Sequence, residues 1–348
     1  MPLVSMIMPA YNACNRIAQT IESVLSQRFA DLELIVVDDG STDHTVDVAA
    51  RYAVQDSRVR VLSIPNGGPS AARNAGMAAA SGTYLMFIDD DDAVFLQGLG
   101  PLVEQARETG AELVLTGFEI TDRSTGKTID YMAEHPGLFD RAEMGAELGG
   151  LYIANLLNQC WAKLYRMEFI HQYKLQFSDY RFGEDRLFIF DCLRHARTVL
   201  VSPEKTYKYY VNTNGSLVNR FYDRKFEACC ALDSSINELA VQLNAQNAEN
   251  RDIFAYMFLK SVVSCMVTVF SDTCPLDRRG RRTYIRTILN HDRVRANAEV
   301  PFHKGMAGDM MRLVLRTRWV GLNLLAMRMI TLANRLLPAL FIKIKHRK

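Results

Sequence analysis

The chain of 348 residues lacks the cysteine and histidine patterns of a disulfide framework or a zinc site. Its seven cysteines are odd in number and irregularly spaced, and none forms a Cys-x-x-Cys pair. Its seven histidines include no His-x-x-His or His-Glu-x-x-His spacing, so we assign no histidine metal site. Cysteines of this kind are typical of reduced, cytosolic proteins.

A secretion signal, an internal repeat and low-complexity tracts are also missing. The first residues run straight into an apolar segment without a basic region or a cleavage site, so we expect a cytoplasmic protein. Hydrophobic residues make up 49% of the chain and charged residues 23%. This composition supports a large core and excludes a disordered or fibrous chain.

The formal net charge of +2 hides an uneven distribution. Residues 312–348 contain nine lysines and arginines and no acidic residue, whereas the rest of the chain is mildly acidic. The basic character is therefore a property of the tail, and we expect no nucleic-acid partner.

Short apolar runs alternate with amphipathic segments of helix length in the first third of the chain. The runs are Val4–Met8, Leu32–Val37, Val59–Ile64, Tyr84–Ile88 and Leu113–Thr116. This alternation predicts an α/β fold with a mostly parallel sheet and helices on both of its faces. Residues 118–139 are polar and predict a hairpin or loop excursion, and beyond about residue 222 the pattern is helical.

Acidic residues follow two of the predicted strands. Four consecutive aspartates, Asp89–Asp92, come after one apolar run, and Asp38 and Asp39 come after another, ahead of Gly40. Ligands bind at the carboxyl ends of the strands in such sheets, so we expect these acids in one cleft. Adjacent carboxylates repel each other unless a cation lies between them, and Mg²⁺ or Mn²⁺ is the natural partner. The alternative is a solvated acidic turn that caps the next helix.

A glycine turn at residues 66–68 leads into a helix that Pro69 opens at its first turn. Backbone N–H groups of this turn and the guanidinium of Arg73 are placed to face phosphate oxygens. Turns of this kind before helices are common, so the segment alone is a weak signal.

Four segments together resemble the ordered motifs of family 2 glycosyltransferases with the GT-A fold. They are Val4–Asn12, Val37–Asp43, Gly68–Gly76 and Gly82–Asp92. The resemblance implies an inverting transferase of the bacterial cell-surface polysaccharide type. It also implies a nucleotide-sugar donor, often a UDP-sugar, and a divalent cation, Mg²⁺ or Mn²⁺.

The resemblance also implies roles for single residues. The residues expected to hold the nucleotide base and ribose are Pro9, Tyr11, Asp38 and Asp39. Arg73 is expected to lie against the donor. Asp89 and Asp91 match the two ends of the family's Asp-x-Asp motif and are expected to bind the metal, with Asp90 between them on the donor side.

Glu184 and Asp185 follow Gly183 at the head of an apolar helix. A positive helix end favours an ionised carboxylate there, although acids are also common in the first turn of ordinary helices. Inversion needs a carboxylate that removes the proton of the acceptor hydroxyl. Many members of the family carry Gly-Glu-Asp in this region, which implies Asp185 as the base and Glu184 as a positioning residue.

Two further segments resemble family features with less specificity. Trp161 and Lys163 lie in a segment similar to the family's acceptor side and are candidates for stacking on a sugar and binding phosphate, although a tryptophan in the core is the alternative. Tyr207–Tyr210, followed by residues 214–216, resembles the segment that closes over the donor diphosphate. The alternative for this segment is an edge strand followed by a turn.

Parts of the sequence also suggest three rival functions. Asp90–Val94 also fits the nucleophile motif of haloacid-dehalogenase-type phosphatases, but that motif normally follows the first strand of its domain. A sugar nucleotidyltransferase would need a glycine- and arginine-rich loop after the first strand, where this chain has residues 9–13. A non-catalytic glycan-binding protein would lose carboxylates, and all the expected acids are present.

The predicted organisation has three parts. Residues 1–220 form the GT-A catalytic domain, with a nucleotide-sugar half at about 1–117 and an acceptor half at about 118–220, and residues 221–311 form a helical extension. Residues 312–348 form a basic amphipathic helix in which Arg312, Arg316, Arg328 and Arg335 share one face. Such a tail suits the anionic cytoplasmic leaflet and predicts a peripheral membrane enzyme with a glycan or lipid-linked acceptor. The alternative is a helix packed on the catalytic domain or across a dimer.

Overall fold

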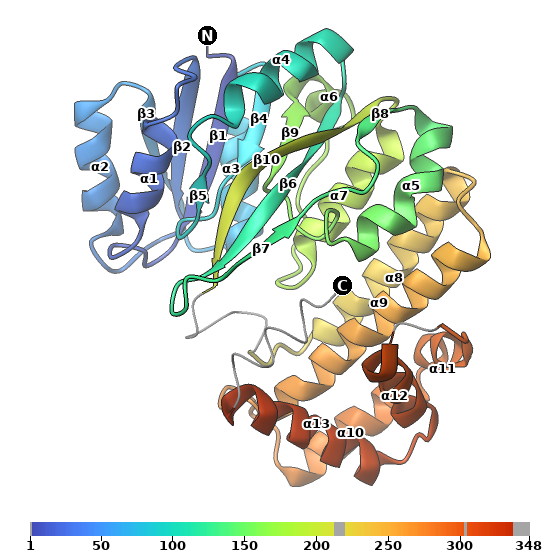
Figure 1. Cartoon of the computed structure of the whole chain (residues 1–348). Coiled ribbons are helices and arrows are strands. Elements are labelled where there is room, and N and C mark those ends of the chain that lie inside the picture. The colour runs from blue at the N-terminus through green and yellow to red at the C-terminus, as the bar shows by residue number, and fades with distance from the viewer. Residues whose placement is uncertain (1, 212–219, 303–304, 337–348) are drawn as a thin grey trace. The chain divides into compact units, whose positions relative to one another are not determined.

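The computed structural model describes residues 2–211, 220–302 and 305–336 (Figure 1). The chain divides into two compact units, one of residues 1–211 with 242–244 and one of residues 212–241 with 245–348. The first division lies near the end of the catalytic domain predicted at residue 220. Residues 305–336 belong to the same unit as the helices that precede them.

The first unit is a ten-stranded sheet with helices. Its elements are β1 Val4–Ala10, α1 Ile17–Leu25, β2 Leu32–Asp38, α2 Thr45–Gln55, β3 Val59–Ser63, α3 Pro69–Ala79, β4 Tyr84–Phe87, β5 Ala93–Val94, α4 Leu99–Thr109, β6 Leu113–Asp122, β7 Thr128–Tyr131, β8 Gly137–Phe139, α5 Arg141–Ile153, β9 Lys163–Arg166, α6 Met167–Gln172, α7 Glu184–His195 and β10 Val199–Val211. All five predicted strands are present, and the polar excursion is the β6–β7 hairpin.

The strand order of the sheet is β3-β2-β1-β4-β9-β6-β10-β5. Strands β3, β2, β1 and β4 are parallel, as predicted, whereas β9 runs antiparallel to both β4 and β6. The order reverses direction after β3, so right-handed crossovers put α1 and α2 on one face of the sheet and α3 on the other. This reversal makes a topological switch point between β1 and β4, which is where open α/β sheets bind ligands.

Helix α3 lies unusually close to the sheet. A Cβ atom at Gly76 would collide with Ile7 of β1, so only glycine allows this approach. Gly68, with φ of 88°, turns the chain into α3, and Pro69 occupies its first turn. The close packing buries Arg73, one turn before Gly76, against the carboxyl end of the sheet.

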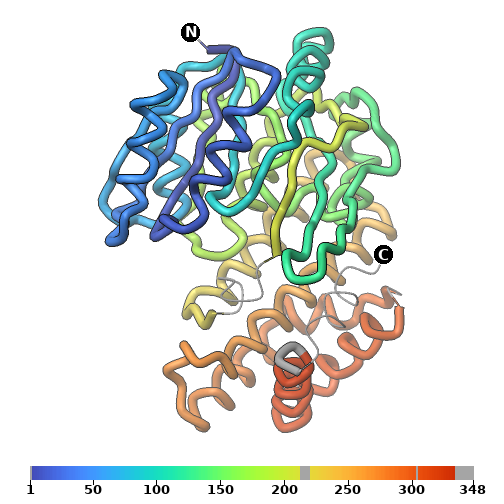
Figure 2. The backbone as a smooth tube through the Cα atoms, turned by 60° about the vertical axis from the view of Figure 1, so that its left-hand side comes forward, coloured from blue at the N-terminus to red at the C-terminus, as the bar shows by residue number. Residues whose placement is uncertain are grey.

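The second unit is helical. Its elements are α8 Lys225–Gln242, α9 Ala248–Val267, the 3₁₀ turn η2 Thr268–Phe270, α10 Arg278–Asn290, α11 Asp292–Glu299, α12 Gly305–Arg316 and α13 Val320–Leu336. Helices α11, α12 and α13 all pack on α9 (Figure 2). Among the described residues, the α9–η2 segment Ala248–Phe270 is long and apolar enough to cross a membrane by length and composition, but 61% of its most apolar window is buried inside the unit. It is therefore equally typical of the central helix of a helical bundle.

The prediction of a single amphipathic helix from residue 312 onward is wrong, because the described residues form two helices there, α12 and α13. The chain leaves α12 after Arg316 and passes through Arg318 at a φ of 54° before α13 begins. Arg316 forms an ion pair with Glu299 at 2.8 Å. Residues 337–348, which include all the basic residues predicted at the end of the tail, lie outside the described part of the chain. Residues 214–216 also lie outside it.

Candidate active site

Three strand ends and one helix start supply the residues of the site. Tyr11 follows β1, Asp39 follows β2, and Asp89–Asp92 follow β4, while Glu184 and Asp185 open α7. β1, β2 and β4 are almost entirely buried apolar runs, which carry the polar residues to one edge of the sheet. The predicted convergence of these motifs is present in the structure.

Arg73 connects the strand-end acids to the acids of α7. Its Nη2 donates to Asp89 Oδ1 at 3.1 Å, and its Nη1 donates to Asp185 Oδ1 at 2.9 Å and to Glu184 Oε1 at 3.4 Å. The side chain is 5% exposed and lies over the ring of Phe177. Three carboxylates share this one guanidinium, so the cluster carries excess negative charge when all three are ionised.

The four aspartates alternate between partly open and buried positions. Asp89 and Asp91 are half-buried, whereas Asp90 and Asp92 are buried. Asp90 accepts two hydrogen bonds from the Arg16 guanidinium, at 2.7 and 3.0 Å. The partly open pair is the one predicted to bind metal, and Asp90 is held by Arg16, which the sequence analysis missed.

Asp92 has a structural role that the sequence did not reveal. Its carboxylate accepts from the Tyr207 hydroxyl at 2.7 Å and from the Tyr210 backbone N–H at 2.9 Å. The same Tyr207 hydroxyl accepts from the backbone N–H of Asp89 at 3.0 Å. Strand β10, which carries Tyr207, has neighbours on both sides, so the edge-strand alternative for this segment is wrong. Tyr207 therefore fixes the backbone of the aspartate run from inside the sheet.

The residues expected at the nucleotide base differ in exposure. Pro9 is the penultimate residue of β1, and Tyr11, which follows the strand, is 47% exposed. Asp38 accepts from the Ser41 backbone N–H at 3.2 Å, and Asp39 accepts from the backbone N–H groups of Gly67 and Gly68 at 2.7 and 2.8 Å. Asp39 thus ties the end of β2 to the glycine turn ahead of α3.

The two acceptor candidates are buried in this structure. Trp161 stacks on Tyr207 with ring centroids 4.3 Å apart and is 7% exposed. Lys163 is 1% exposed, its Nζ donates to the Trp161 carbonyl at 3.2 Å, and burial lowers the pKa of its ammonium to about 7. Both side chains therefore pack in the sheet, and their contact with an acceptor stays a prediction.

Burial changes the protonation of two acids in the cluster. Burial, and next the charge of Asp185, raise the pKa of Glu184 to about 7. Burial also raises the pKa of Asp89 to about 6, against the opposing effect of Arg73. Acids with raised pKa values are common at functional sites and also occur in structural ion-pair networks.

Replacing Glu184 by glutamine is expected to flatten the pH dependence of stability. A carboxyl group with a raised pKa binds its proton more tightly in the folded chain, so the free energy of unfolding falls as the pH rises from 4.5 to about 7. Glutamine does not titrate, so the fall should shrink by up to about 1.4 kcal/mol per pH unit in that window. Urea unfolding of both proteins across this pH range measures the effect.

The matched control is Glu104→Gln, at an exposed glutamate of α4 whose side chain is 61% exposed. Its pH dependence should follow that of the parent protein. Equal slopes for the Glu184→Gln variant and the parent would contradict the assignment of the raised pKa to Glu184.

Comparison with known proteins shows which family this arrangement resembles. Residues 5–171, a little under half of the chain, match the family model described as glycosyl transferase family 2. This segment is similar to a family 2 glycosyltransferase domain. The match covers the strand-end acids and Arg73, and it ends before Glu184 and Asp185. It supports the glycosyltransferase prediction over the phosphatase and nucleotidyltransferase alternatives.

Two curated relatives and one solved structure illustrate the similarity. The chain is 37% identical over 216 residues to the uncharacterized glycosyltransferase EpsJ of Bacillus subtilis (strain 168). The aligned region covers 61% of this chain and 62% of that protein. The chain is 28% identical over 263 residues to the succinoglycan biosynthesis protein ExoO of Rhizobium meliloti (strain 1021), covering 72% of each. The crystal structure of Staphylococcus aureus TarS 1–349 in complex with UDP-GlcNAc superposes with a TM-score of 0.64 at 20% identity, over 96% of this chain and 92% of that one. The predicted α/β fold of the GT-A type with additional C-terminal helices is thereby confirmed.

Proposed function

We propose that this chain is an inverting glycosyltransferase that moves a sugar from a nucleotide-sugar, in the first place a UDP-sugar, to a hydroxyl of a glycan or lipid-linked acceptor. The observation that carries the proposal is the position of Arg73 between Asp89 and Asp185. One guanidinium joins an acid of the donor motif to the acid expected to act as base. A single-displacement reaction needs both within reach of one sugar.

On the donor side, Asp89 and Asp91 fit a divalent cation. They offer carboxylate oxygens, the ligands that Mg²⁺ and Mn²⁺ prefer, at half-buried positions. Among the described residues, no group of three or more His, Cys, Asp or Glu side chains is arranged to hold a metal by itself. Two protein carboxylates suffice for a cation shared with a diphosphate. Such a cation supplies positive charge where the leaving diphosphate gains negative charge.

Nucleotide recognition is assigned to Tyr11 and Asp39, at the neighbouring ends of β1 and β2. The exposed ring of Tyr11 is a platform for the flat face of a base. The TarS structure holds UDP-GlcNAc in a protein of the same fold, which supports a UDP-sugar as the donor.

On the acceptor side, the carboxylate of Asp185 takes the proton from the acceptor hydroxyl. The hydroxyl oxygen then forms a bond to the anomeric carbon while the bond from that carbon to the diphosphate oxygen breaks on the opposite side, which inverts the configuration. Arg73 pairs with Asp185 at 2.9 Å and fixes its orientation. Glu184 contacts the same guanidinium and helps to position Arg73 and Asp185.

The helical unit supports the proposed lipid-linked acceptor and the proposed location at a membrane surface. Large apolar side chains recur at intervals of four and three residues on the exposed faces of α12 (Met306, Met310, Leu313) and of α13 (Leu325, Met329, Leu332). Exposed apolar stripes on a basic segment are typical of helices that lie in a membrane interface. The name of ExoO supports a role in polysaccharide synthesis, and a lipid-linked acceptor would be presented at that surface.

A panel of nucleotide-sugars tests the catalytic proposal. The purified full chain is incubated with UDP-, GDP-, dTDP- and CMP-sugars, with Mn²⁺ or with EDTA, and release of the nucleotide is measured. We expect metal-dependent release from at least one donor, and a UDP-sugar before the others. Binding without turnover for every donor would favour the non-catalytic alternative.

A further inference from the structure

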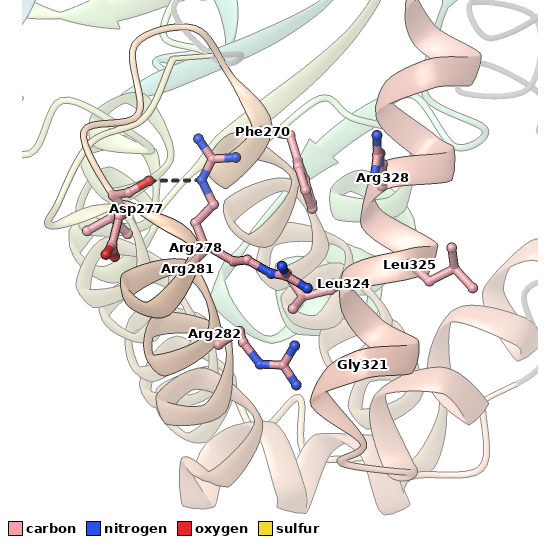
Figure 3. A pocket seen from close by; sticks show the side chains of 10 residues that line it. Phe270, Asp277, Arg278, Arg281, Arg282, Gly321, Leu324, Leu325 and Arg328 are labelled. Carbon is pink, nitrogen blue, oxygen red and sulfur yellow. Dashed lines mark hydrogen bonds between the residues drawn. The ribbon is translucent and has the colours of Figure 1, made fainter.

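A cavity of about 710 Å³ lies between α10 and α13 in the helical unit (Figure 3). Its wall includes four arginines, Arg278, Arg281, Arg282 and Arg328, and one carboxylate, that of Asp277. Figure 3 shows arginine side chains of α10 extending toward α13. The cavity is far along the chain from the catalytic acids and contains none of the residues assigned to sugar transfer.

None of the four arginines of this cavity forms an ion pair with a described residue. No hydrogen bond or ion pair to a described residue holds Arg278, Arg282 or Arg328. Arg281 donates from Nε to the carbonyl of Leu276 at 3.0 Å. Asp277 is engaged in capping α10, because its Oδ1 accepts from the Gly280 backbone N–H at 2.6 Å.

Arg278, Arg282 and Arg328 are exposed to solvent. Four guanidinium groups around one open space concentrate positive charge there, and this charge attracts an anion. Guanidinium is the side-chain group best matched to phosphate, because its planar N–H donors engage two oxygens at once. The charge of the cavity therefore selects a phosphate group over a neutral ligand.

The rest of the wall is apolar. It consists of Phe270, Leu276, Gly321, Leu324 and Leu325. Leu325 also begins the exposed stripe of α13. The cavity thus joins a phosphate-binding wall to a surface suited to hydrocarbon. A free phosphate ester would use the first part alone, whereas a phospholipid would use both.

We propose that the cavity between α10 and α13 binds the phosphate of an anionic membrane phospholipid. The inference rests on the membrane association proposed above and not on the sugar-transfer reaction. A lipid held there anchors the helical unit at the bilayer surface, with the stripes of α12 and α13 in the interface.

Charge reversal in the cavity tests the inference against a matched control. The cavity variant is Arg278→Glu with Arg282→Glu. The control is Arg279→Glu with Arg286→Glu, which changes the net charge equally on the same helix at two exposed arginines that do not line the cavity. Each full-length protein is floated with phosphatidylcholine vesicles and with vesicles that contain about one third phosphatidylglycerol.

We expect the parent and the control variant to float with the anionic vesicles and the cavity variant to partition at least about tenfold less. Equal loss in the two variants would mean that general surface charge attracts the membrane, and would overturn the site. Failure of the parent protein to float would overturn both the site and the membrane association, while leaving sugar transfer intact. Nucleotide release should be unchanged in both variants, which shows that the catalytic unit remains folded.

A titration in solution separates a lipid from a free phosphate ester and does not depend on vesicles. Calorimetry compares dihexanoyl phosphatidylglycerol with glycerol 3-phosphate, using the parent protein and the milder variant Arg328→Gln. We expect the short-chain lipid to bind more tightly than glycerol 3-phosphate and to lose affinity in the variant. Equal affinity for the two compounds would assign the cavity to a free phosphate ester and overturn the lipid.

Discussion

Replacing Asp185 by asparagine is expected to lower sugar transfer at least about a hundredfold, because an amide does not accept the proton of the acceptor hydroxyl. The hydrogen bond from Arg73 to Oδ1 at 2.9 Å has an equivalent in the asparagine side chain, so the geometry of the site should persist. Donor affinity should stay near that of the parent. Initial rates with the donor identified from the panel, together with calorimetric binding of that donor, measure both effects.

The control for this variant is Asp191→Asn on the same helix. The side chain of Asp191 is 44% exposed and pairs with Arg194 at 2.8 Å, away from Arg73. Its rate should match that of the parent. A parental rate in the Asp185→Asn variant would place the base elsewhere, and Glu184, which shares Arg73, would be the next candidate.

Replacing Asp91 by alanine is expected to abolish the metal-dependent part of turnover, at least about a hundredfold. The reason is the charge of the leaving group: a nucleotide diphosphate departs with charge that the cation must offset. Nucleotide release with added Mn²⁺ and with EDTA measures the loss, and Mn²⁺-dependent binding of the free nucleoside diphosphate provides a second reading.

Asp47→Ala is the control for the Asp91 substitution. Asp47 lies on α2 of the same unit with a side chain that is 64% exposed and interacts with His44. Its removal should leave the metal dependence unchanged. Full turnover of the parent protein in EDTA would contradict the metal assignment itself.

The strand ends of the site could be predicted from the sequence because each follows a continuous apolar run. Three strands are buried on both faces: Val4–Ala10, Leu32–Asp38 and Tyr84–Phe87. Their apolar runs are continuous in the sequence, so the end of each strand and the polar residues that follow it can be predicted. The base-side acids were found for a related reason, since Glu184 and Asp185 open an apolar helix.

The central place of Arg73 could not be predicted in the same way. It depends on the docking of α3 on β1 at Gly76, and on a contact with Asp185 that is 112 positions away along the chain. The burial of Lys163 could not be predicted, because a lysine in a polar segment does not indicate that its strand, β9, lies in the middle of the sheet. The chain between α12 and α13 passes through Arg318 at a φ of 54°, and nothing in the apolar pattern of the sequence indicates this break.

The sharing of Arg73 has a thermodynamic consequence for the two halves of the site. Asp89 and Glu184 share the positive charge of Arg73, so any ligand that draws Asp89 away from Arg73 alters the proton affinity of Glu184 on the other side. Linkage makes this relation reciprocal: protonation of Glu184 must change the affinity of the Asp89 side for its ligand by the same factor. Ligand binding at Asp89 and protonation of Glu184 are therefore coupled, and neither has a single intrinsic equilibrium constant that is independent of the other.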